Sequence, residues 1–100
     1  MGYYAVIGGK LQVPLASVSG WREFKRWTSD LDAEQFGNVL HLVEHAWTED
    51  LPELARQLTL ALRTVPPSAS VAKTAKDLIR ELKRAPKRAS SLFISDGTSE

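Results

Sequence analysis

The chain has 100 residues, of which 43% are hydrophobic and 25% are charged, as expected for one globular domain with a packed core. Thirteen Lys and Arg residues against 12 Asp and Glu residues leave a formal net charge of +1, so the overall charge indicates neither a nucleic-acid nor a membrane partner. The absence of cysteine excludes thiol catalysis, zinc–thiolate sites and disulfides. The longest apolar run, residues 3–7, is too short for a signal peptide or a membrane span, so we expect a cytoplasmic protein.

The start of the chain predicts a β-hairpin. Two β-prone runs, residues 3–7 and 10–15, are separated by Gly8-Gly9, and both glycines can adopt the positive φ angles of a two-residue turn. This turn places Val6 opposite Leu11 and makes one face of the hairpin wholly apolar.

A third strand is predicted at residues 91–95, which are β-prone and are followed by the turn-forming pair Asp96-Gly97. A two-stranded hairpin is marginally stable by itself, so we expect this strand to join it in one sheet. The last few residues are expected to form a flexible tail.

Four helices are predicted between the hairpin and the last strand. Residues that commonly cap helix N-termini precede them: Ser17 or Ser19, then Asp32, Asp50, and Ser68 or Ser70. The expected helices cover residues 20–29 and 33–48, the segment from Asp50 to Pro66-Pro67, and the segment from Ser68 or Ser70 to just before Pro86.

Apolar side chains recur at helical spacing in these four segments and predict their buried faces. The predicted core positions are Trp21, Phe24, Thr28 and Leu31; Phe36, Val39, Leu40, Val43 and Trp47; Leu51, Leu54, Ala55, Leu58, Ala61, Leu62 and Val65; and Val71, Ala75, Leu78, Ile79 and Leu82. The sequence therefore predicts a single α+β domain over residues 1–100, with an N-terminal β-hairpin, four helices and a C-terminal strand that joins a small antiparallel sheet.

Residues 41–45 have the spacing H-x-x-E-H of the inverted zinc-protease motif, with His41 and His45 one helical turn apart and Glu44 beside them. Both histidines point away from the predicted core face, and a catalytic zinc needs a third protein ligand and a dry cleft. We therefore interpret them as solvent-exposed residues that folding does not require. A metal-dependent enzyme at His41 and His45 is our third choice of function.

Residues 70–90 contain seven basic and two acidic residues, a local charge of +5. Five of the basic residues form a stripe opposite the apolar face of the fourth predicted helix: Lys73, Lys76, Arg80, Lys83 and Arg84. Such a stripe is able to follow the phosphates of a nucleic acid, although a surface helix also has a polar face for solvation alone. No aromatic residue lies between Val71 and Arg88, so this segment offers no platform for base stacking.

Three large apolar residues lie off the predicted core faces of their helices: Trp27, Leu42 and Leu60. Large apolar side chains outside the core are typical of contact surfaces, so these residues are candidates for binding a partner.

The sequence favours a non-enzymatic protein-interaction or regulatory module, without cofactor, from a bacterial or phage system. Caps, turns and solvated faces account for most of the polar residues that catalysis would need, and this exclusion favours a module without enzymatic activity. The alternative is a nucleic-acid-associated protein that uses the basic stripe.

Overall fold

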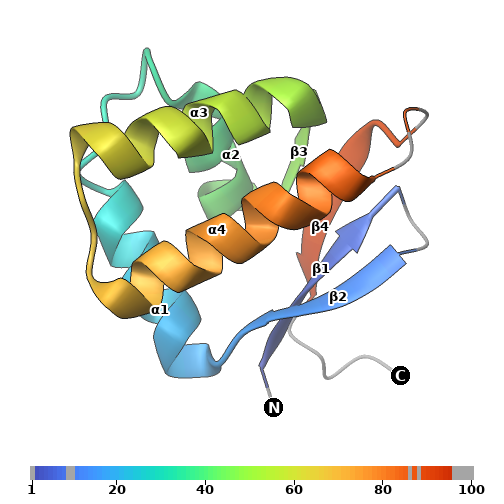
Figure 1. Cartoon of the computed structure of the whole chain (residues 1–100), viewed down its shortest axis with the longest axis horizontal. Coiled ribbons are helices and arrows are strands. Elements are labelled where there is room, and N and C mark those ends of the chain that lie inside the picture. Colours follow the sequence, from blue (N-terminus) through green and yellow to red (C-terminus); the bar gives the residue numbers. More distant parts are fainter. Residues whose placement is uncertain (1, 9–10, 86, 88, 96–100) are drawn as a thin grey trace.

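The computed structural model describes residues 2–8, 11–85, 87 and 89–95 of the chain. Its elements, in chain order, are β1 (Tyr3–Ile7), β2 (Leu11–Ala16), α1 (Val18–Thr28), α2 (Gly37–His45), β3 (Trp47–Glu49), α3 (Leu51–Thr64), α4 (Ala69–Arg84) and β4 (Ser91–Ser95). The helices pack on one face of an antiparallel sheet with the strand order β2-β1-β4-β3 (Figure 1). The α+β fold class is confirmed. Gly9, the predicted turn at Asp96-Gly97 and the predicted tail lie outside the described residues.

The β1–β2 hairpin is confirmed, but its predicted register is wrong. Three residues rather than two separate the strands, so Ile7 instead of Val6 pairs with Leu11. Because side chains alternate along a strand, this shift of one residue places Ala5 and Ile7, instead of Tyr4 and Val6, on the face of the hairpin that carries Val13. Ala5 and Ile7 are buried in the core, whereas Tyr4 and Val6 are only partly buried.

The C-terminal strand β4 lies between β1 and β3, which confirms that it joins the hairpin in one sheet. Its inward residues, Leu92 and Ile94, are buried and continue the core face of β1. Gly8 adopts a φ of +64° and donates its backbone amide to the carbonyl of Ser91 at 2.8 Å. The end of β1 is thereby tied to the start of β4.

Three helices begin at the caps that the sequence predicts. The side-chain oxygens of Ser17, Asp50 and Ser68 each accept a hydrogen bond from the backbone amide three residues further along. The alternatives Ser19 and Ser70 lie inside α1 and α4. The core positions predicted for these helices are all buried or partly buried.

The second helix is shorter than predicted at both ends. Asp32 does accept a hydrogen bond from the backbone amide of Gln35, but the residues after Asp32 form turns, and α2 begins only at Gly37. The helix ends at His45 because Ala46 adopts the left-handed conformation, with a φ of 58°.

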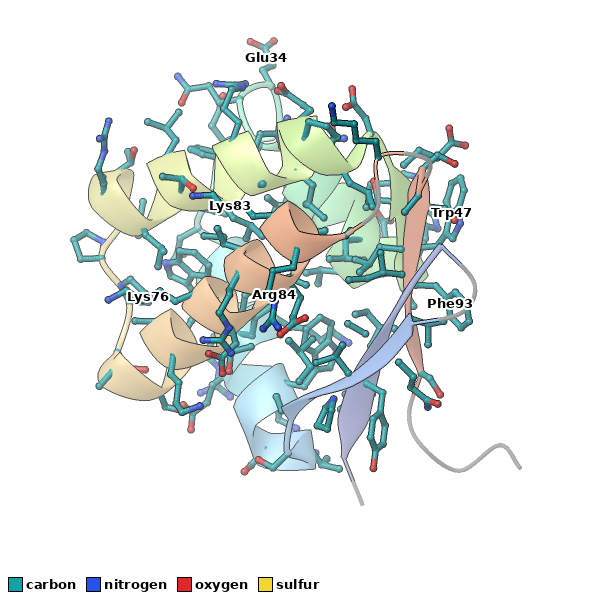
Figure 2. The ribbon with its side chains drawn as sticks, turned by 45° about the vertical axis from the view of Figure 1, so that its right-hand side comes forward. Glu34, Trp47, Lys76, Lys83, Arg84 and Phe93 are labelled. Atoms are coloured by element: carbon teal, nitrogen blue, oxygen red, sulfur yellow. The ribbon has the colours of Figure 1, made fainter. Side chains whose placement is uncertain are left out.

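The helical periodicity predicts that Trp47 is a core residue of the second helix, and this prediction is wrong. It opens the edge strand β3, is 39% exposed and pairs with Phe93, which is 40% exposed. Figure 2 shows both side chains on the side of the sheet that is turned away from the helices. Pairing of β3 with β4 supplies backbone partners that a longer helix would leave missing at the edge of β4.

The two sides of β4 provide a test of the shared sheet. Leu92→Ala should lower the free energy of unfolding by about 2–5 kcal/mol, because it opens a cavity under the sheet. Phe93→Ala, on the exposed side of the same strand, is the matched control and should cost less than half as much. Chemical denaturation of both variants measures the difference. Equal losses would contradict a core packed on the inner face of β4.

Candidate functional site

An open groove of about 660 Å³ lies between α3 and the C-terminal end of α4, together with the segment that follows α4. Figure 1 shows α3 and α4 side by side, and the two helices are in contact. Most of the groove's lining is apolar, with Leu51, Pro52, Ala55 and Leu60 from α3 and Leu82 from α4. Leu51 and Leu82 are buried, whereas Ala55 and Leu60 are partly exposed. The floor of the groove is therefore continuous with the core.

Basic side chains surround this floor, and none of the described residues that line the groove is acidic. Arg56 and Arg63 come from α3, Lys83 comes from the end of α4, and Lys87 follows it. Within the described part of the chain, only Arg56 of these four is paired with a carboxylate. Figure 2 shows Lys83 between the ribbons of α3 and α4. The groove thus combines an apolar floor with three cations that have no counter-ion among the described residues.

The carboxylate that pairs with Arg56 belongs to Glu53, one turn earlier on α3. The Nε atom of Arg56 donates to Glu53 Oε1 at 2.9 Å, and Gln57 Nε2 donates to Glu53 Oε2 at 2.9 Å. Hydrogen bonds from Arg56 and from Gln57 lower the pKa of the Glu53 carboxyl from 4.5 to about 2. Glu53 is therefore ionised at neutral pH, and it holds the Arg56 guanidinium at the edge of the groove.

Gln57 is a buried polar residue that the sequence analysis did not identify. Its Oε1 atom accepts hydrogen bonds from the backbone amides of Asn38, at 2.9 Å, and Val39, at 3.4 Å. These are the amides of the second and third residues of α2, and the N-cap residue Phe36 supplies no side-chain acceptor for them. Gln57 therefore caps α2 from α3. No local sequence signal identifies this cap, because the two partners are 19 residues apart.

Two of the three residues predicted to bind a partner are part of the core. Trp27 is 7% exposed and its indole Nε1 donates to the carbonyl of Val65 at 2.7 Å, which satisfies the polar atom of a buried ring. Leu42 is fully buried, because α2 packs with more than one side against its neighbours. The premise that these two side chains lie outside the core is wrong. Leu60 is partly buried and lines the groove.

The five basic residues predicted to form a stripe on α4 are all exposed, but acidic neighbours pair with three of them. Asp77 accepts from Lys73 at 2.9 Å and lies 3.1 Å from Arg80. Glu81 lies 3.9 Å from Arg84. Lys76 and Lys83 have no carboxylate partner among the described residues and line a shallow depression around Ile79.

His41 and His45 are exposed, and their ring centroids are 4.5 Å apart. The Nδ1 atom of His41 lies 2.7 Å from the carbonyl oxygen of Trp47, which can only accept, so this nitrogen is the donor. Across the described ranges, no cluster of three or more His, Asp or Glu residues is arranged to hold a metal ion.

Removing the amide of Gln57 should destabilise the fold. Gln57→Met keeps the length of the side chain but leaves the amides of Asn38 and Val39 without an acceptor. The expected loss is about 1–3 kcal/mol of unfolding free energy, the usual cost of an unsatisfied buried donor. The control is Gln35→Met, an exposed position where a change within about 0.5 kcal/mol is expected. Urea denaturation measures the unfolding free energy of both variants. Equal values for the two variants would contradict a stabilising role of the Gln57 cap.

The histidine pair should be dispensable for folding. Replacing both His41 and His45 by Gln is expected to change the unfolding free energy by less than about 1 kcal/mol, because both side chains are exposed. Thermal denaturation with and without Zn²⁺ measures this. A folded wild-type protein that retains one equivalent of zinc after dialysis would contradict this interpretation.

In the groove between α3 and α4, an apolar floor lies beside cations that have no carboxylate partner among the described residues. In the part of the chain that the structure describes, no helix has the length and apolar character needed to cross a membrane.

The chain matches no protein-family model, no curated protein and no solved structure.

Proposed function

We propose that this protein is a non-enzymatic interaction module that binds a protein partner in the groove between α3 and α4. The observation that carries the proposal is the open apolar floor, where Ala55 and Leu60 remain partly exposed beside the buried Leu51 and Leu82. Apolar surface that stays accessible in a folded domain and is rimmed by polar residues is typical of a binding site.

The chemistry of the lining favours a peptide over a small molecule. The volume of about 660 Å³ suits either ligand, but small-molecule sites present a few fixed polar groups that converge on the ligand. Here the polar atoms belong chiefly to the exposed, flexible side chains of Arg63, Lys83 and Lys87. Flexible cations around an apolar floor resemble the rim of a protein–protein interface.

The alternative function is nucleic-acid binding by the basic face of α4. Lys76 and Lys83 support it, because neither has a carboxylate partner among the described residues. The pairing of Lys73 and Arg80 with Asp77 argues against it, since it reduces the positive charge available to phosphates.

Site-specific photo-crosslinking tests whether the groove contacts a protein. A photoreactive amino acid at Thr59, which lines the groove, should form a discrete covalent adduct with a protein in an extract of the cells that express the chain. The same amino acid at Glu23, an exposed position on α1 outside the groove, is the control and should not form that adduct. Mass spectrometry of the adduct identifies the partner.

A second substitution links the adduct to the apolar floor. Leu60→Asp places a charge on the floor and should abolish the adduct formed at Thr59, while circular dichroism verifies that the variant is folded. Ala55→Gln narrows the groove without adding charge and should reduce the yield several-fold. Equal adduct yields from Thr59 and Glu23, or a yield unaffected by both floor substitutions, would contradict the proposed function.

A further inference from the structure

We infer that the partner presents an acidic amphipathic helix to the groove. This inference rests on the proposed function and names the chemistry of the occupant. Three features of the groove point to this occupant: its length, the spacing of its lining residues and the sign of its charges.

The lining residues from α3 recur at the spacing of one helix face. They form pairs at 51–52, 55–56 and 59–60 and end with Arg63, so each step is one turn of α3. From Leu51 to Arg63 this face extends about 18 Å, at about 1.5 Å per residue. A partner helix of about three turns matches that length, and its apolar residues at i, i+3 or i+4, and i+7 would lie along the floor.

The charges around the floor determine which partner fits. Arg63 lies near the C-terminal end of α3, and Lys83 and Lys87 lie on the opposite side of the groove. None of the three has a carboxylate partner among the described residues, and no acidic residue is found among the described residues of the lining. Carboxylates on both sides of the partner's apolar stripe would complement these cations, whereas basic residues would be repelled.

Lys83 extends the same charge pattern beyond the groove. It also lines the shallow depression on α4, where Ile79 is surrounded by Lys76, Arg80 and Arg84. Lys76 and Lys83 have no carboxylate partner among the described residues, so the unpaired positive charge continues from the groove onto the exposed face of α4. An acidic partner gains attraction from this surface before it makes apolar contacts, which favours rapid association.

The floor makes a helix a better occupant than a nucleic acid. Aromatic rings are the usual stacking platform for unpaired bases, and none is found among the described residues that line the groove. The phosphate backbone has no apolar groups to cover Ala55 and Leu60, so a duplex would leave the floor exposed to water. A helix with an apolar stripe uses both the floor and the cations.

Three synthetic helical peptides of 15 residues test the inference. They share one apolar stripe of leucines and differ only at the flanking positions, which are all Glu, all Gln or all Lys. The Glu peptide should bind the full chain at least about tenfold more tightly than the Gln peptide, and the Lys peptide should bind more weakly than either. Fluorescence anisotropy at low and at moderate salt measures the affinities, and the advantage of the Glu peptide should shrink as salt rises.

Charge reversal locates the effect. The double variant Arg63→Glu and Lys83→Glu should lose at least about tenfold in affinity for the Glu peptide and should gain affinity for the Lys peptide. The matched control is Arg22→Glu with Lys25→Glu, two exposed residues of α1 that do not line the groove and that change the net charge by the same amount. The control should change the affinities by less than about threefold. Equal losses in the two double variants would show that net charge, rather than the groove, is responsible, and would overturn the inference.

The remaining outcomes separate the inference from the proposed function. If the Glu and Lys peptides bind equally and Leu60→Asp abolishes both, the acidic partner is wrong while the groove remains a protein-binding site. If no peptide binds, the helical occupant is wrong, and the crosslinking at Thr59 independently decides the proposed function. A 20-base-pair DNA duplex, or vesicles containing phosphatidylglycerol, that bind more tightly than the Glu peptide and compete with it would also overturn the inference.

Discussion

The position of α3 depends on one buried side-chain amide, that of Gln57. The helix α2 begins without a side-chain cap of its own, so its first amides would lack acceptors in a partly buried environment. Gln57 Oε1 accepts from the backbone amides of Asn38 and Val39, and its Nε2 atom donates to Asn38 Oδ1 at 3.3 Å and to Glu53 at 2.9 Å. An unpaired buried amide costs about 1–3 kcal/mol, so a slide or rotation of α3 against α2 is opposed by several polar contacts at once.

This constraint also determines which residues of α3 face the groove. At about 100° per residue, Thr59 and Arg63 lie more than about 100° around the helix from Gln57. Fixing Gln57 against α2 therefore directs these two residues outward. The Glu53 carboxylate connects the two sides of α3. It accepts a hydrogen bond from Gln57 on the inner side of the helix and another from Arg56 on the groove side. These hydrogen bonds lower the pKa of its carboxyl to about 2, so the carboxylate that accepts them is ionised at neutral pH. The core and the edge of the groove are thus connected by hydrogen bonds within one helix.

Local signals in the sequence predict much of this fold. The caps at Ser17, Asp50 and Ser68 and the strand at residues 91–95 depend on neighbouring residues, and they are confirmed. The wrong predictions concern features that are determined by residues distant in the sequence. The register of the hairpin depends on β4, which pairs with Ala5 and Ile7 through inward-facing Leu92 and Ile94. Trp47 forms a strand because β4 offers an edge, and the indole N–H of the buried Trp27 finds its acceptor in the carbonyl of Val65, 38 residues away. Of the residues that line the groove, the sequence predicts only Leu60 and Lys83 as binding residues. A groove between two helices is formed by residues of both, so the pattern of one helix does not reveal it.

A net charge of +1 conceals how unevenly the charges are distributed. The acidic residues near the groove and α4 are mostly engaged: Glu53 with Arg56, Asp77 with Lys73 and Arg80, and Glu81 with Arg84. Pairing within a helix neutralises those cations locally and leaves Arg63, Lys76, Lys83 and Lys87 as the unpaired positive charges of this region, within the described residues. Exposed charges interact over about 8 Å at physiological ionic strength, so a partner senses these four side chains rather than the charge of the whole chain. Three of the four, Arg63, Lys83 and Lys87, surround the apolar floor, so attraction and burial act at the same place. A ligand that offers only one of the two, such as a polyanion or an uncharged apolar helix, leaves half of the surface unused.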